Sequence, residues 1–518
     1  MLELRYFPWQ PSKRRLTVKH RIEKDSLGER KVPAEVYYGI QTQRAVENYP
    51  ISGYRAHPIL IRAMGMIKKA AALANQELGL LDERRAGAIV QAAEEVMAGK
   101  LNDQFVVDVY QAGAGVSFHM NTNEVVANRA IEILGGKRGD YSVVHPNDHV
   151  NFGQSTNDVI PTAMRLASIL LFDQLLPEME RLSRAFAKKG HEFDGILKSG
   201  RTHMQDATPI LLGQEFAAYA VAILRSYEQV RQAQDALREL GLGGTAVGTG
   251  VNTHPRYQAT VTKRLSEVAR TELIPTKDMR WTMQSNLPMA VASSALRNYA
   301  LELIRISNDL RLLSSGPNTG LGEINLPALQ PGSSIMPGKI NPVMPENIAM
   351  IAFQVVGADV AVALAVQAGQ LELNVMMPTM MWNVLHSAEI LKNGTRQFTT
   401  LCVEGITANK EACRGHAEST VSLATALNPY IGYAKTAEIV KQAVKTGRRI
   451  TEIALEKKLL DEKTLKKILD ARRMTEPAPP LEDGLAKKKS AAKPKVQAAK
   501  GPLRAKRRAP KRPPVRRK

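Results

Sequence analysis

Residues 332–342, Gly332-Ser-Ser-Ile-Met-Pro-Gly-Lys-Ile-Asn-Pro, hold two hydroxyls, a cation and an amide within nine positions. They lie near the end of segment 314–345, which has five Gly and six Pro in 32 residues. This composition excludes a long regular element and is typical of a lid or binding loop. Hydroxyl, ammonium and amide groups donate hydrogen bonds to anions, so we expect a mobile, anion-binding loop. An exposed linker is the alternative, but it leaves Lys339 and Asn341 unexplained.

Three further polar clusters stand out against the apolar helical segments, at residues 113–124, 149–158 and 200–206. The second directly precedes an apolar segment, so Ser155, Thr156 and Asn157 fall at an N-cap and first helical turn. Backbone N–H groups and the helix dipole favour an anion there. Each cluster alone is more often a cap or a turn. Together with the loop they offer hydroxyls, amides, a few His and one Lys, without a Cys/His metal set, which favours a small dicarboxylate as substrate.

Long amphipathic helices must position these groups. Leu296, Leu303 and Leu310 repeat every seven residues, which predicts a helix with an apolar seam. Similar patterns predict long helices over 164–189, 212–240 and 345–370, with a kink or break at Pro177. Strand signals are scarce and aromatic residues make up only 5% of the chain. We therefore predict an all-α fold built on a long central helical bundle.

The charge of the chain is unevenly distributed. The formal net charge is +21, from 71 basic and 50 acidic residues, yet residues 487–518 hold 15 Lys or Arg and no acid. Residues 1–20 carry a net +4, so the body is nearly neutral. The C-terminal tail, rich in Pro and like charges, is predicted to be disordered. Two interpretations stay open: a salt-dependent grip on nucleic acid or another polyanion, and a solvated tail without a partner.

The cysteine content, the N-terminal sequence and the apolar segments indicate the cellular compartment of the protein. With 518 residues and only two cysteines, Cys402 and Cys413, the chain has no need of a disulfide scaffold and fits a reducing compartment. Residues 1–20 lack the apolar core of a secretory signal. Residues 349–369 are too polar for a membrane span and predict a buried helix whose extra apolar surface is a subunit interface. We expect a cytoplasmic protein that does not enter a membrane.

The loop at 332–342 resembles the signature loop of the aspartase/fumarase superfamily, and the resemblance extends from about residue 21 to 474. Segments 110–115, 120–124 and 369–376 are more similar to aspartases, whereas 200–209 and 244–255 lean towards fumarases. The resemblance implies a homotetramer with active sites shared among subunits and no required cofactor. It also implies a domain order, with ranges expected at 1–20 (basic extension), 21–155 (N-terminal domain), 156–410 (central bundle), 411–475 (small C-terminal domain) and 476–518 (basic tail).

The resemblance further implies that L-aspartate is converted reversibly to fumarate and ammonium, through β-proton removal and an enediolate-like intermediate. Ser333 would be the base, and Lys339 and Asn341 would hold the α-carboxylate. Hydroxyls of Ser155 and Thr156 would hold the β-carboxylate, with Ser334 helping as the loop closes. The other implied site residues are Asn157 near the amino group, Thr202 and His203 at the α-carboxylate or amine, Glu346 orienting His203, and Ser117 in the first cluster.

The first cluster departs from the family pattern. Family members usually carry Gly-Thr where this chain has Gly115-Val116, followed by Ser117. Valine is nearly isosteric with threonine but lacks the hydroxyl, and losing one donor to the developing enediolate costs about 3 kcal/mol. Phe118 and His119 also differ from the expected residues. Two explanations stay open: Ser117 or His119 compensates, or the substrate differs. The sharper hypothesis is altered or reduced aspartase activity, and the plainer one is a tolerated change.

Two alternatives remain at this stage. A fumarate hydratase would share the base and the carboxylate grip, releasing water from malate instead of ammonia from aspartate. A weakened lyase scaffold that binds polyanions through residues 487–518 is the alternative from another functional class.

Overall fold

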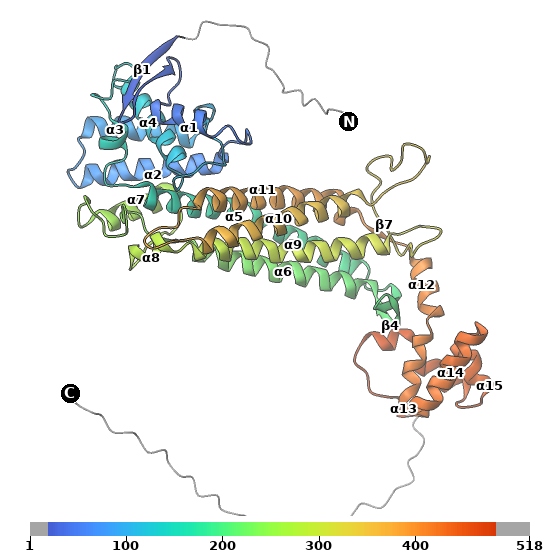
Figure 1. Ribbon diagram of the computed structural model, residues 1–518. Helices are drawn as coiled ribbons and strands as arrows, with labels where there is room; N and C mark the ends of the chain where they lie inside the picture. Colours follow the sequence, from blue (N-terminus) through green and yellow to red (C-terminus); the bar gives the residue numbers. More distant parts are fainter. Residues whose placement is uncertain (1–18, 483–518) are drawn as a thin grey trace, which may run out of the picture. The chain divides into compact units, whose positions relative to one another are not determined.

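The computed structural model describes residues 19–482, which form two compact units (Figure 1). One contains residues up to 199 together with 210–418, and the other contains 200–209 together with 419 onwards. Both sequence extremes, 1–18 and 483–518, lie outside the described residues, so the basic extension and the polyanion-binding tail stay predictions. The domain ranges expected from the sequence also remain a prediction.

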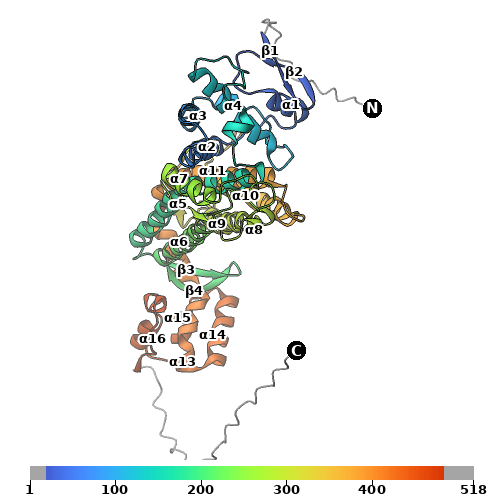
Figure 2. The same cartoon turned by 90° about the vertical axis from the view of Figure 1, so that its left-hand side faces the viewer.

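Five long helices form the centre of the larger unit. They are α5 (Thr156–Glu192), α6 (Leu212–Ala236), α9 (Leu287–Leu313), α10 (Val343–Gln367) and α11 (Met377–Leu401). Consecutive members of the order α5, α6, α9, α10, α11 pack together, and α11 packs against α5, so the helices close into a ring. Figure 2 views this bundle from one end. The predicted long central helical bundle is confirmed.

The predicted seam on α9 is also confirmed, because Leu296, Leu303 and Leu310 are completely buried. Of the kink or break predicted at Pro177, the break is wrong, because α5 continues through Pro161 and Pro177 as one helix. A proline removes one backbone hydrogen bond. The burial of Leu175 and Met179 on either side of Pro177 shows what holds the helix together there.

The segments before α5 form a helical cap on one end of the bundle. Helix α2 packs against α3, α5 and α7, and α4 packs against α1, α3 and the π-helical turn. The bounds of these segments are β1 His20–Asp25, β2 Gly28–Pro33, α1 Ile40–Asn48, α2 Pro58–Glu77, α3 Glu83–Met97, α4 Val116–Ile133 and the π-helical turn Pro146–Val150. Two short helices follow later in the chain, α7 Tyr257–Ala269 and α8 Met279–Gln284.

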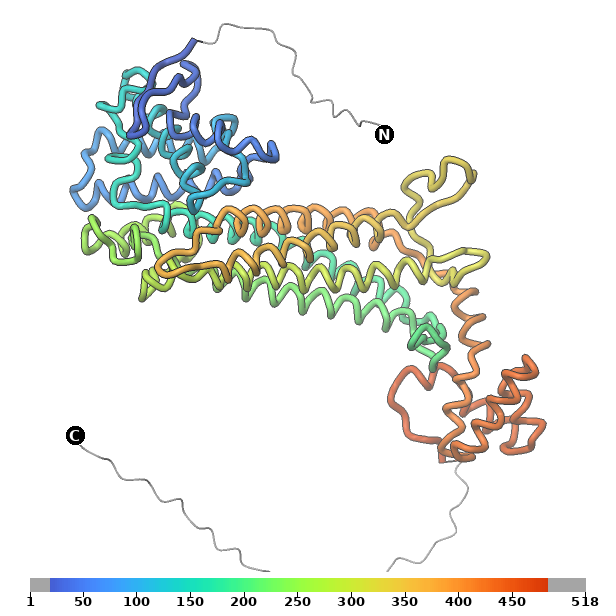
Figure 3. Tube along the Cα trace, viewed as in Figure 1, coloured from blue at the N-terminus to red at the C-terminus, as the bar shows by residue number. Residues whose placement is uncertain are grey.

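Within residues 19–482 the strands are short and form two-stranded sheets. In the larger unit β7 (Ile324–Asn325) pairs antiparallel with β8 (Thr407–Ala408), and β5 (Glu239–Leu240) pairs parallel with β6 (Ile274–Pro275). The β7–β8 pair ties the start of the Gly/Pro-rich loop to the bundle end where α9 and α11 terminate. The tube in Figure 3 follows this loop between α9 and α10.

The smaller unit has its own core, which includes Leu427, Ile439, Ile453 and Leu465. The tip of the hairpin of β3 (Leu197–Thr202) and β4 (Gln205–Leu211) also belongs to it. Its main helices are α13 Asn428–Ile431, α14 Tyr433–Thr446, α15 Ile450–Glu456 and α16 Glu462–Ile468; α12 (Lys410–Ser419) leads into it.

Two helices, α5 and α10, are long and apolar enough to cross a membrane by length and composition. The apolar stretch of α5 is 83% buried within the bundle, whereas that of α10 is only 39% buried. The exposed side chains of α10 include Met350, Phe353, Val360 and Leu364. The prediction that residues 349–369 are too polar for a membrane span is wrong, because α10 meets that test by length and composition. The predicted surplus apolar surface is present, with one face of α10 in the bundle core and another uncovered in a single chain.

Candidate active site

The first turn of α5 carries three of the predicted site residues. Ser155 is the N-cap: its Oγ accepts from the Asn157 N–H at 3.3 Å, and its own N–H donates to Asp158 Oδ1 at 2.8 Å. The amide of Asn157 donates to the Ala246 carbonyl at 2.8 Å. Thr156 and Asn157 sit half-buried at a helix N-terminus, where N–H groups and the dipole attract negative charge.

The Asp158 carboxylate anchors this turn through hydrogen bonds from backbone N–H groups. It is completely buried, and its Oδ2 accepts from the N–H groups of Gly243 and Thr245 at 2.9 and 3.1 Å. Burial raises the pKa of Asp158 to about 6, against the opposing effect of those N–H groups and of Lys68. The carboxyl thus fastens the glycine-rich 243–250 segment to the start of α5.

Two buried polar side chains, His119 and Lys68, form a hydrogen-bonded series that ends at the Thr156 hydroxyl. His119 Nδ1 lies 2.8 Å from Thr156 Oγ1, and His119 Nε2 lies 2.9 Å from Lys68 Nζ. Both His119 and Lys68 are buried. Desolvation lowers the pKa of Lys68 to about 7, opposed by the charge of Asp158, and holds the pKa of His119 well below its ordinary value. His119 is therefore a neutral imidazole.

The first polar cluster, residues 113–124, contains the start of α4, which lies next to the start of α5. Residues 113–115 all have positive φ, from 57° to 88°, and this tight turn delivers Val116 as the first residue of α4. A Cβ on Gly115 would lie 3.2 Å from the Ile160 side chain, so the starts of α4 and α5 are adjacent. Val116 is 40% exposed, and Val116 and Ser117 line a cavity of about 490 Å³ together with residues such as Gln41, Arg44, His145 and Asn147.

Hydrogen bonds join the two ends of residues 332–341 in the Gly/Pro-rich loop. The Gly332 N–H donates to the Lys339 carbonyl at 2.7 Å, and the Asn341 amide donates to the Gly332 carbonyl at 2.7 Å. A Cβ on Gly332 would lie 2.6 Å from that Lys339 oxygen, so only glycine fits without moving the backbone. The loop walls include Ser333, Met336 and Lys339 around a cavity of about 440 Å³.

Ser333 occupies a distinctive position in this loop. Its Oγ accepts hydrogen bonds from the backbone N–H groups of Ile335 at 3.2 Å and Met336 at 2.9 Å. Two donors aimed at one oxygen favour its negatively charged form. Ser334 and Lys339 are exposed, and Asn341 is half-buried. Ile335 is 85% exposed, which is costly for an apolar side chain unless something covers it.

The remaining predicted residues fall into two places. Glu346 is half-buried in the first turn of α10, four residues after the Pro342 carbonyl that its N–H contacts. Thr202 and His203 belong to the smaller unit, where His203 and Met204 form the two-residue turn of the β3–β4 hairpin with φ of 55° and 59°. His203 is exposed at this turn, and neither bulky residue prefers such a φ. Its predicted orientation by Glu346 stays a prediction.

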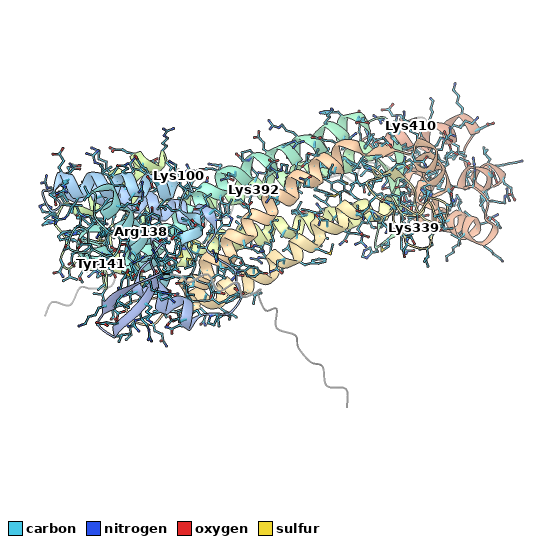
Figure 4. All side chains as sticks on the ribbon, turned by 90° about the horizontal axis from the view of Figure 1, so that it is seen from above. Lys100, Arg138, Tyr141, Lys339, Lys392 and Lys410 are labelled. Atoms are coloured by element: carbon cyan, nitrogen blue, oxygen red, sulfur yellow. The ribbon has the colours of Figure 1, made fainter. Side chains whose placement is uncertain are left out.

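A single chain does not bring all these groups together. Ser155 and Thr156 lie where α5 begins, whereas the loop lies at the other end, where Lys189 near the end of α5 bonds to the Ile406 carbonyl beside β8. An α-helix of 37 residues is about 55 Å long. Figure 4 shows Lys339 at the opposite end of the molecule's larger unit from Arg138 and Tyr141 of the cap.

Three contributors escaped prediction from sequence: Lys68, His119 as a Thr156 partner, and Asp158. For Lys68 a signal existed, because it follows Met64 and Ile67 on an apolar stretch of α2 where a charged side chain is out of place. Asp158 lay within the second polar cluster as the N3 residue of a capping box.

Comparison with known proteins connects the chain to one group of lyases. A family model described as "Lyase" matches residues 28–357, and one described as "Fumarase C C-terminus" matches 423–476. The chain is 48% identical to an aspartate ammonia-lyase of Bacillus sp over 88% of this chain and 98% of that protein. It is 50% identical to a class II fumarate hydratase of Halobacterium salinarum, over 88% and 97% respectively.

Solved structures agree. The crystal structure of a fumarate lyase:delta crystallin from Brucella melitensis bound to cobalt is 48% identical, with a TM-score of 0.85 over 89% of this chain and 100% of that chain. A class II fumarase from Schistosoma mansoni is 36% identical, with a TM-score of 0.86 over 88% of this chain and 99% of that chain.

Proposed function

The chain belongs to the lyase family that includes the aspartate ammonia-lyases and class II fumarases, and from this premise we propose that it converts L-aspartate reversibly to fumarate and ammonium. Several aspartate ammonia-lyases, from Bacillus, Helicobacter and Pseudomonas, support this choice at 46–48% identity along nearly their whole length.

Ser333 is the proposed base, and the observation that carries this role is the pair of N–H groups on its Oγ. A serine hydroxyl is far too weak a base unless its alkoxide is stabilised. The Ile335 and Met336 N–H groups supply that stabilisation before substrate arrives. Lys339 and Asn341 hold the α-carboxylate from the same loop, and Ser334 reaches the β-carboxylate as the loop closes.

The start of α5 holds the other end of the substrate. Ser155 and Thr156 bind the β-carboxylate with the helix N-terminus behind them, and Asn157 contacts the amino group. Ser117 adds a hydroxyl from α4. Thr202 and His203 contact the α-carboxylate or the amine, and Glu346 orients His203.

The reaction is an elimination. The Ser333 alkoxide takes the Cβ proton, and the C–H electron pair flows into the β-carboxylate to give an enediolate-like dianion. That pair then forms the carbon–carbon double bond as the Cα–N bond breaks and the substrate's ammonium group leaves as ammonia. The ammonia takes up the proton held by Ser333 and becomes ammonium, which restores the alkoxide. Because the Cβ proton is only weakly acidic, the rate depends on donors aimed at the growing negative charge. Oxidation states balance without an added reductant, so we propose that no organic cofactor is required.

Completing the site requires other copies of the chain. The loop and the start of α5 are separated by the length of the bundle, and α10 leaves an apolar face uncovered. We therefore propose a homotetramer in which bundles pack through α10 and each site takes the loop from one subunit and the α5 turn from another. The two buried cysteines, Cys402 and Cys413, are compatible with the proposed cytoplasmic location.

A substrate assay tests the proposed function. Purified protein is supplied with L-aspartate or L-malate, and fumarate is followed by its ultraviolet absorbance. We expect fumarate from L-aspartate with kcat/KM at least tenfold above that for L-malate. The reverse preference would establish a fumarate hydratase, the second candidate, which the Halobacterium relative supports.

The same assay run on a chain truncated after residue 486 separates the third candidate. If the tail is an appendage, turnover stays unchanged. Loss of DNA binding on truncation, with no turnover of either dicarboxylate by the full chain, would favour a polyanion-binding scaffold instead.

A further inference from the structure

Lys68 is an unusual cation, because no carboxylate contacts it in the described residues. Its Nζ meets three acceptors: Asn151 Oδ1 at 3.0 Å, Gln154 Oε1 at 2.8 Å and His119 Nε2 at 2.9 Å. The orientation of both amides is fixed, since their NH₂ groups donate to backbone carbonyls of residues 150, 152 and 154. Three acceptors match the three hydrogens of an ammonium. Burial lowers the pKa of Lys68 to about 7 while the charge of Asp158 opposes that shift, so below this pH the side chain is the ammonium that the three acceptors match.

This arrangement selects one form of His119. Because the ammonium has hydrogens only to give, Nε2 must accept, and the hydrogen of the neutral ring must sit on Nδ1. Nδ1–H then donates to Thr156 Oγ1, 2.8 Å away. The Thr156 oxygen is occupied as an acceptor, so its own hydrogen is free to point elsewhere. An Nε2–H ring would reverse this order and draw the Thr156 hydrogen back towards the protein.

We propose that Lys68 and His119 are positioning residues that turn the Thr156 hydroxyl hydrogen towards the substrate carboxylate. The proposal rests on the proposed function, in which Thr156 binds the β-carboxylate. Figure 1 shows α2 and α4 in the cap at one end of the bundle, the end where α5 begins. A cation at the far end of such a chain also polarises each bond along it, which makes the Thr156 hydroxyl a stronger donor.

The benefit falls mainly on turnover. Negative charge grows on the β-carboxylate in the transition state, and an interaction that strengthens there lowers the barrier instead of merely tightening binding. Val116 has no hydroxyl to offer at the neighbouring α4 terminus, so more of the charge stabilisation depends on the orientation of the Thr156 hydroxyl.

A double-mutant cycle tests the proposal. Thr156→Val, His119→Leu and the double variant are assayed with L-aspartate, and succinate affinity is measured as a ground-state reference. We expect kcat to fall about 100-fold, about tenfold and about 100-fold respectively, with succinate affinity within threefold of wild type in His119→Leu. His119→Asn, whose amide both accepts and donates, should restore kcat to within threefold of wild type.

Lys68→Met gives a second, independent cycle with Thr156→Val, should His119→Leu fold poorly. The matched control is Lys69→Met, which removes the adjacent lysine that pairs with Glu94 at the surface. Losses of His119→Leu and Thr156→Val that multiply in the double variant would overturn the positioning role, as would kcat within twofold of wild type in His119→Leu. No turnover of aspartate or malate by the wild type would instead overturn the proposed function.

Discussion

The two parts of the proposed site are built in opposite ways. At the start of α5 the groups are half-buried, capped and backed by Asp158, His119 and Lys68. At the loop, Ser333 and Lys339 stand in a short irregular segment with exposed Ile335 and Ser334 around them. The rigid part suits holding a carboxylate whose charge must be stabilised. The open part suits a base that must admit substrate and then exclude water.

Substitutions in the loop should reduce activity more than substitutions at the start of α5. Ser333→Ala removes the proposed base but leaves the backbone N–H groups in place. A base supplies about 10²–10⁴-fold, so we expect kcat on L-aspartate to fall about 10³-fold, with thermal stability unchanged because Ser333 lies in an irregular loop outside the hydrophobic core. Steady-state kinetics and a melting curve measure this. Ser142→Ala, in an exposed turn of the cap, is the control. Ser333→Ala activity within tenfold of wild type would assign the base elsewhere.

The shape of the loop should matter next. Gly332→Ala places a Cβ against the Lys339 carbonyl and the Asn341 backbone, so the ends that close the loop must separate. Displacements of about 1 Å cost about 10²-fold, and we expect kcat/KM to fall by that amount. Gly87→Ala, on the exposed side of α3 with open space around it, should leave kinetics unchanged and raise stability slightly. Equal kinetics for both variants would show that loop closure is not needed.

The sequence anticipated these two regions unequally. Loop residues were recognisable because Ser333, Lys339 and Asn341 lie close together in a Gly/Pro-rich segment, so local composition carried the signal. The Lys68–His119–Thr156 chain joins three helices across 51 and 37 residues, and no local pattern contains it. The helical bundle followed from the apolar repeats, but the unbroken α5 did not, because packing around Pro177 depends on side chains distant in sequence.

Val116, at the start of α4, provides a further test of the half-buried part of the site. Val116→Thr adds a hydroxyl at the start of α4 with little change in volume, next to a cavity that gives it room. We expect kcat on L-aspartate to rise about tenfold, less than the 10²–10³ of a full oxyanion donor because Thr156 already supplies one. Val116→Ile, without a hydroxyl, should give no gain. Absence of any gain in Val116→Thr would mean that this position no longer faces the substrate.

The smallest expected effect is a loss of folding stability at acid pH. It arises from buried His119, which lies beside the first turn of α5. His119 is neutral when folded, whereas in the unfolded chain it takes up a proton below its ordinary pKa of 6.5. The unfolded state then binds more protons, so stability falls as pH drops below 6.5, by about 1.4 kcal/mol per pH unit for this one group. His119→Asn should remove that share, so its melting temperature should fall less steeply than that of wild type between pH 6.5 and 5. Burial also lowers the pKa of His57, His149 and His386, but these residues are present in both proteins and cancel in the comparison. Parallel melting curves would mean that His119 is already protonated in the folded protein, and an imidazolium cannot accept a hydrogen from Lys68.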